Sequence, residues 1–313
     1  MTTGQLVQLV CEKINMTDAA TKALVMKWAD SRHRMLCQRA LWRDLLSLYT
    51  IAVPAAAAEI ILGRQIEAVI GAKYDLTNLL PVNQTFIFAA DPGLWDRTGR
   101  ASRMAQLPAV ATSAHPQAER LALVSSNAAD TTQQVAITGE LAGFPMEEVL
   151  TLNGTTPVLS ANSYDVVYSL AKEETAGTVT ITGNTSAAAL SVIAARDTGY
   201  QYPRIRLLET PSEAISLLVL AKRRVAALRS NAQPTAFDGL DLALEAFVLA
   251  DAYEWQRQNA DADAKRAEGM ALLQQLLDTQ VFQDAAITQL VPYDSEGPGE
   301  FPSEGGFSGK GFW

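Results

Sequence analysis

The chain has 313 residues, which is enough for two domains or for one domain that carries a large insertion. Hydrophobic residues make up 48% of the sequence and charged residues only 19%, so we expect a globular fold that hides part of its surface against partners. The formal net charge of −9 argues against a dedicated nucleic-acid binder, because phosphate contacts require basic clusters. The sequence also predicts no signal peptide and no membrane-spanning segment.

Four segments near the two ends of the chain carry apolar residues at helical spacing. They are residues 4–14, 17–48, 234–257 and 262–277. Thr17 and Asp261 are the expected N-caps of the second and fourth helices. The last two helices predict a hairpin that packs on the N-terminal helices, so that both chain ends meet in one core.

Apolar runs with strand character lie between these helices. They cover residues 49–54, 59–62, 68–72, 204–208 and 215–220. The first run predicts an edge strand that stops at Pro54. The last two runs predict a pair of strands around a turn at Pro211, which joins the earlier strands in a small sheet. Residues 76–80 predict a short helix, residues 83–90 fit either a strand or a helix, and residues 91–93 predict a turn.

Residues 119–195 have a different composition, rich in Thr, Ser, Val, Gly and Asn. Short alternating runs recur there, and glycine-containing turns separate them. Six or seven short strands at this spacing predict a β-sandwich of roughly immunoglobulin size.

The predicted fold class is therefore α+β. A helical-bundle body with a small sheet takes residues 1–115 and 200–291, and an inserted immunoglobulin-like β-sandwich takes residues 116–199. Residues 292–313 predict a disordered or extended C-terminal tail, because a segment rich in Gly, Ser, Pro and acidic residues cannot bury enough apolar surface to fold alone.

Aromatic residues are spaced along this tail and are candidate anchors for a groove on a partner. The candidate partner-binding residues are Tyr293, Phe301, Phe307, Phe312 and Trp313.

The densest basic run is Lys222, Arg223 and Arg224, with Arg229 nearby. It follows an apolar strand-like segment. One interpretation is a solvated strand end or a contact between subunits, and the other is a patch that faces a DNA channel. The sequence leaves both open.

We find no catalytic or metal-binding pattern in the sequence. His33 and His115 are far apart, and we expect both to be surface or interface residues. The glycine-lysine segment before Lys310 is not a phosphate-binding loop, because Glu304 stands where the first glycine is required. Cys11 and Cys37 lack metal-site spacing, so we expect buried thiols. The expected protein is not an enzyme and holds no cofactor and no metal.

A local motif in the predicted sandwich points to a family. Residues 135–139 precede Gly143, then residues 147–154 and residues 177–181 follow. This order resembles immunoglobulin-like modules inserted in virion proteins. Together with the layout of N-terminal helices, central sandwich and C-terminal hairpin, the chain resembles head-to-tail adaptor (connector) proteins of tailed bacteriophages. The layout covers most of the chain, whereas the motif covers only residues 135–181.

The resemblance implies a homo-oligomeric ring, typically of twelve copies, at the neck of a virion assembled in the host cytoplasm. The ring would join the portal protein to the tail or nozzle protein and surround the exit channel for double-stranded DNA, without sequence-specific binding. An acidic chain suits a channel through which DNA slides.

Two alternatives stay open. The first is another virion component, such as a tail-tube, capsid-decorating or fibre-attachment protein, although a tube protein should be mostly β. The second is a carbohydrate- or surface-binding module on the sandwich, with Tyr164 and Tyr168 on one face of a single strand.

Overall fold

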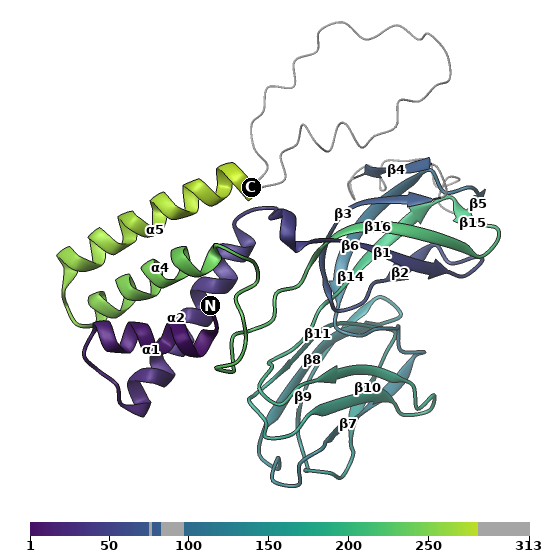
Figure 1. The fold of residues 1–313 in the computed structure, drawn as a ribbon. Coiled ribbons are helices and arrows are strands. Elements are labelled where there is room, and N and C mark those ends of the chain that lie inside the picture. The colour runs from purple at the N-terminus through teal and green to yellow at the C-terminus, as the bar shows by residue number, and fades with distance from the viewer. Residues whose placement is uncertain (75–76, 83–96, 281–313) are drawn as a thin grey trace, which may run out of the picture. The chain divides into compact units, whose positions relative to one another are not determined.

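The structure is a computed structural model that describes residues 1–74, 77–82 and 97–280 (Figure 1). Strands account for 40% of the protein and helices for 27%, so the fold is mainly β. The predicted helical-bundle body with a small sheet is therefore wrong. In the described residues, four α-helices form one layer, and the rest of the body is a curled sheet of seven strands.

The four predicted helical segments are confirmed, with changed ends. They form α1 (Thr3–Lys13), α2 (Ala19–Gln38), α4 (Leu240–Trp255) and α5 (Asn259–Gln280). As predicted, the N-terminal helices and the helical hairpin of α4 and α5 share one core, whose members include Leu6, Leu36, Trp42, Leu244, Phe247 and Leu273.

The start and the end of α2 differ from the prediction. Asp18, not Thr17, caps the helix, because its carboxylate accepts hydrogen bonds from both the backbone N–H and the hydroxyl of Thr21. The helix stops at Gln38, ten residues before the predicted end, and a short 3-10 turn (Arg43–Leu45) leads into a strand. Asp261 likewise lies in the first turn of α5 and is not its cap.

The sheet has the strand order β1-β16-β3-β4-β6-β14-β2. Its strands are β1 (Leu46–Val53), β2 (Glu59–Ile61), β3 (Ile66–Tyr74), β4 (Thr77–Val82), β6 (Arg103–Val110), β14 (Tyr202–Leu208) and β16 (Ile215–Arg223). A separate parallel pair joins β5 (Thr98–Gly99) to β15 (Thr210–Pro211).

Two predictions about this sheet are wrong. β4 lies where a short helix was predicted, because pairing with β3 on one side and β6 on the other outweighs the local helical pattern. β14 and β16 do not pair with each other, since β3, β4 and β6 lie between them. The predicted edge strand is confirmed as β1, which among the described strands pairs with β16 alone and ends just before Pro54. Residues 83–96, where we predicted a strand or helix and then a turn, lie outside the described residues.

The strands predicted in residues 119–195 are confirmed, and one more strand, β10, is found there. The seven strands are β7 (Glu119–Ser125), β8 (Gln134–Leu141), β9 (Phe144–Thr151), β10 (Val158–Tyr164), β11 (Val166–Lys172), β12 (Val179–Gly183) and β13 (Ala189–Ile193). They form a four-stranded sheet, β10-β7-β12-β13, and a three-stranded sheet, β11-β8-β9. Leu123 and Ile181 of the first sheet share one core with Ile137 and Val167 of the second, so the two sheets form a sandwich.

The glycines of the sequence motif have a packing role in this sandwich. A Cβ added to Gly139 would lie 2.3 Å from the backbone oxygen of Val166 on the neighbouring strand. Gly154 has a φ of +56° and lies against the backbone of Ala128. Both positions therefore require glycine for close backbone approach.

Substituting Gly139 with alanine is expected to destabilise the protein by about 1–3 kcal/mol, because the strands must separate to admit the methyl group. Gly71→Ala is the matched control, since a Cβ at this strand position meets nothing within 4 Å. Urea denaturation of both variants checks this. Equal midpoints for the two variants would show that the contact at Gly139 is unimportant.

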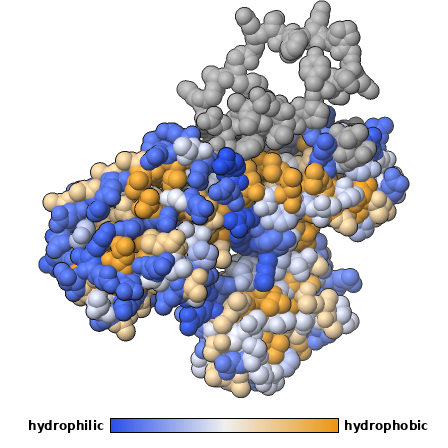
Figure 2. Space-filling model, in the orientation of Figure 1, coloured by the Kyte–Doolittle hydropathy of each residue, from blue (hydrophilic) through white to orange (hydrophobic). Residues whose placement is uncertain are grey.

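Hydrophobic side chains are exposed over part of the seven-stranded sheet. In Figure 2 they gather where β1 and β16 lie. Of the helices in the described ranges, none combines the length and the apolar character needed to cross a lipid bilayer.

Candidate functional site

The basic run at the end of β16 contacts other parts of the same chain. Lys222 is buried, and its Nζ lies 3.3 Å from Oε1 of Glu67. It is not the solvated strand end that one interpretation predicted. The reason is that β16 is a central strand, with β1 and β3 on its two sides, so Lys222 lies over the sheet and needs the carboxylate of Glu67 as a partner.

The two arginines that follow bind backbone carbonyls. The guanidinium of Arg223 donates to the carbonyl of Ala236 at 2.9 Å, and that of Arg224 donates to the carbonyl of Gln201 at 2.6 Å. The backbone N–H of Arg224 also donates to Gln65 at 2.7 Å. The run therefore joins the end of β16 to the turn before β3 and to the segment before β14.

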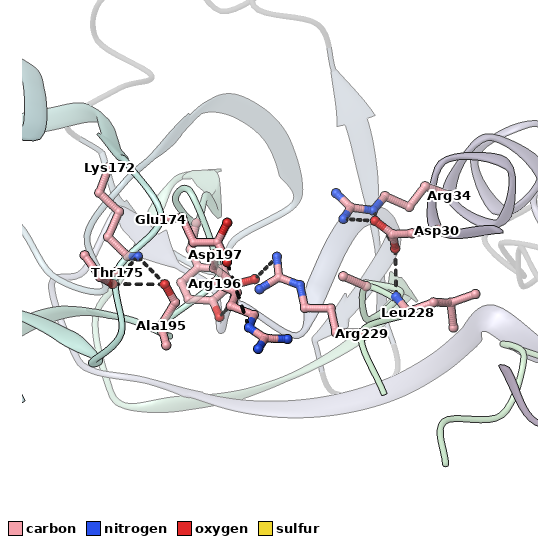
Figure 3. Close-up of polar contacts among 12 residues, drawn as sticks. Asp30, Arg34, Lys172, Glu174, Thr175, Ala195, Arg196, Asp197, Leu228 and Arg229 are labelled. Carbon is pink, nitrogen blue, oxygen red and sulfur yellow. Dashed lines mark hydrogen bonds and ion pairs between the residues drawn. The ribbon is translucent and has the colours of Figure 1, made fainter. Parts of the chain in front are cut away.

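Arg229 connects the segment after β16 to the sandwich. Its Nη2 lies 2.6 Å from Oδ1 of Asp197, in the loop that follows β13 (Figure 3). One residue earlier, the backbone N–H of Leu228 donates to Oδ1 of Asp30 on α2 at 2.7 Å, and Asp30 also pairs with Arg34. These contacts attach the segment to both the sandwich and the helical layer.

A buried lysine holds the loop that carries Asp197. Lys172 Nζ donates to Oγ1 of Thr175 at 2.7 Å and to the carbonyl of Ala195 at 2.8 Å (Figure 3). Burial lowers the pKa of Lys172 below its usual range, while the nearby carboxylates of Asp197 and Asp130 raise it. The side chain acts as an internal anchor for the loop.

These segments surround an open cavity of about 940 Å³. Four arginines from three different segments of the chain contribute to its lining, together with two carboxylates. They are Arg34, Arg64, Arg224 and Arg229, with Glu67 and Asp197. The sequence pointed to Arg224 and Arg229, but it missed Arg34 on α2 and Arg64 in the turn before β3, because nothing local marks either residue.

Of the predicted site residues, Lys222, Arg223, Arg224 and Arg229 lie near one another in the structure. The tail residues Tyr293, Phe301, Phe307, Phe312 and Trp313 lie outside the described residues.

His33 is buried, so the prediction of a surface or interface histidine is wrong for it. Its Nε2 accepts a hydrogen bond from the backbone N–H of Ala236 at 3.0 Å. Burial lowers the pKa of His33 to about 4, with the nearby Asp30 raising it and Arg34 lowering it. The sequence did not predict the burial of His33, because its charged neighbours on the helix suggested a solvent-exposed face.

His115 is partly exposed and contacts a carboxylate. Its Nε2 lies 2.7 Å from Oε1 of Glu59, which also accepts from the guanidinium of Arg204 at 3.0 Å. Burial raises the pKa of Glu59, but these two partners outweigh burial and hold the pKa below its usual range. The cluster joins β2 and β14 to the start of the sandwich.

Cys11 and Cys37 are buried free thiols, as predicted. Burial raises the pKa of Cys37 to about 12, which keeps the thiol protonated at neutral pH. In the described part of the chain, no group of three or more His, Cys, Asp or Glu residues is arranged to hold a metal ion.

The two tyrosines proposed as a carbohydrate platform do not share a strand. Tyr164 ends β10 in one sheet and Tyr168 belongs to β11 in the other. Tyr164 is fully buried in the sandwich core. The proposed aromatic face is therefore wrong.

No protein-family model matches the chain, and no curated protein matches it with significant similarity.

Proposed function

We propose that this protein is a virion structural subunit that forms a ring at the head-to-tail junction of a tailed bacteriophage. The ring joins the portal to the tail and surrounds the DNA exit channel. The resemblance of the sandwich motif and of the chain layout to phage adaptor proteins supports this proposal. Under this proposal, the aromatic residues of the C-terminal segment, residues 292–313, bind the portal protein or a protein of the phage tail.

The observation that carries the proposal is an exposed apolar face on an edge strand. Leu48 on β1 is 66% exposed, and Leu218 on the adjacent β16 is 39% exposed. β1 also has one unpaired edge in the described residues. Uncovered apolar side chains beside an open strand edge are typical of a surface that another chain covers. In a closed ring, this surface contacts a different surface of the next copy.

Negative-stain electron microscopy and sedimentation of the purified full-length chain test the proposal. We expect closed rings, either of the chain alone or after addition of particles that lack it. The double variant Leu48→Lys/Leu218→Lys should abolish rings without changing the melting temperature by more than a few degrees, since both side chains are exposed. Leu242→Lys, at a leucine on α4 whose exposure lies between those of Leu48 and Leu218, is the control. A chain that stays monomeric and also fails to bind such particles would exclude the proposal.

One observation favours a second candidate, a tail-tube or other virion component. Strands exceed helices in the structure, 40% against 27%, and a tube subunit is expected to be mostly β. The same images separate the two, because a tube subunit stacks into long tubes whereas an adaptor stops at single rings.

A further inference from the structure

Two arginines of the cavity are free of carboxylate partners among the described residues. Arg64 donates to the carbonyl of Val192 at 3.2 Å, and its guanidinium lies over the ring of Tyr200, 5.0 Å from the centroid. Arg224 donates to the carbonyl of Gln201. By contrast, Arg34 pairs with Asp30 and Arg229 pairs with Asp197. Two full positive charges at the cavity therefore lack a neutralising anion in a chain whose net charge is −9.

Arg64 and Arg224 are close to each other. The backbone N–H of Arg224 donates to the carbonyl of Gln65, the neighbour of Arg64, and their side chains contact the consecutive residues Tyr200 and Gln201. The aromatic ring and the carbonyl of Gln201 therefore hold both guanidiniums against the same stretch of chain, residues 200–201. Such an arrangement is stabilised when an anion binds between the two charges.

The geometry points to a binding site for a small, multiply charged phosphate anion, and we propose this as a second activity of the protein. Four arginines from three chain segments line the cavity against only two carboxylates. The tetrahedral oxygens of a phosphate chain accept hydrogen bonds from several directions, whereas a planar carboxylate suits a single bidentate arginine. Converging arginines therefore favour phosphate.

The size of the cavity favours a small ligand. Its volume of about 940 Å³ lies within the roughly 300–1,000 Å³ that small-molecule sites occupy. A DNA duplex, whose major groove alone is about 12 Å wide, is too large to enter it. The expected occupant has the size of a di- or triphosphate or a nucleotide. This inference does not depend on the proposed ring.

Isothermal titration calorimetry of the full-length chain with tripolyphosphate, in a buffer free of phosphate and of divalent cations, tests the site. We expect saturable binding at one site per chain that weakens as salt is added. The double variant Arg64→Ala/Arg224→Ala should bind at least tenfold more weakly. Arg43→Ala should bind within twofold of the unchanged chain, because this exposed arginine lies outside the cavity lining.

A second variant and a second ligand complete the test. If the double variant does not fold, Arg64→Gln alone replaces it, because Arg64 is exposed and its loss leaves the cores intact. A single-stranded oligonucleotide is titrated in parallel. Binding of the oligonucleotide without binding of tripolyphosphate would overturn the small-anion assignment. Absence of saturable binding, or equal weakening by Arg43→Ala, would overturn the site.

Discussion

Substituting Trp42 with alanine is expected to lower the free energy of unfolding by about 3–5 kcal/mol. Trp42 is fully buried where α2 ends, and its ring packs on Phe237 with the centroids 5.0 Å apart. Its indole N–H donates to the carbonyl of Leu36 at 2.9 Å. The variant therefore loses a large apolar contact and one of the two hydrogen bonds that the Leu36 carbonyl accepts, the other coming from the backbone N–H of Arg39. It also leaves a cavity at the point where the chain passes from the helical layer to the sheet.

Trp255→Ala is the matched control for this substitution. Trp255 ends α4 and contacts Trp28 edge-on, but it is 47% exposed. Replacing Trp255 should lower the free energy of unfolding by less than half as much as replacing Trp42. Urea denaturation followed by tryptophan fluorescence and by circular dichroism measures both variants. A Trp42→Ala variant as stable as Trp255→Ala would show that the helical core does not depend on Trp42.

Acidification from pH 7 to pH 5 is expected to destabilise the protein by about 2 kcal/mol through His33 alone. The pKa of His33 is about 4 in the folded chain, below its ordinary value of 6.5. Between pH 4 and pH 6.5, the unfolded chain therefore binds more protons than the folded chain does. The stabilisation is fully present above pH 6.5 and is lost as the pH falls toward 4, where the total loss reaches about 3 kcal/mol.

Protonation also changes a specific contact. A charged imidazole cannot accept the hydrogen bond from the backbone N–H of Ala236, so the segment before α4 loses this one hydrogen bond to α2. Carboxylates act only at lower pH: hydrogen bonds from Thr21 and Ser186 hold the pKa values of Asp18 and Glu119 below their ordinary 3.8 and 4.5. The stabilisation by these carboxylates is lost only as the pH falls below those values. The loss of stability between pH 6.5 and pH 5 is therefore assigned to His33.

The control for this effect is His33→Gln, whose amide oxygen can accept the same hydrogen bond without titrating. Unfolding free energies at pH 7.5, 6 and 5 should fall for the unchanged chain and stay flat for the variant. Parallel curves for the two proteins would assign the acid sensitivity to other groups.

Local sequence patterns predicted the elements whose stability depends on near neighbours. The apolar spacing of α1, α4 and α5 and the alternation in the sandwich both predicted the observed elements, because each period follows from backbone geometry alone. The motif glycines also have a local reason, since Gly139 and Gly154 allow close backbone approach. The strand β10 was missed because Ser160, Asn162 and Ser163 interrupt its apolar residues.

Pairing between distant strands determined the secondary structure of the rest of the body. The second predicted helix extended to residue 48, yet residues 46–48 belong to β1, which pairs with β16 about 170 residues later. β4 was mistaken for a helix for the same reason. A seven-stranded sheet assembled from three separate stretches of chain is a property of non-local contacts, so the local pattern predicted too little sheet and too much helix.

By itself, the sequence determined the helices at both chain ends, the strands of the sandwich and the glycine positions within it, because these follow from backbone periodicity and local sterics. Only the tertiary structure decided that the body is mainly β, that His33 and Lys222 are buried, and that Arg34 and Arg64 lie at the same cavity as Arg224 and Arg229. The physical reason is that burial and convergence of charge depend on which distant segments pair.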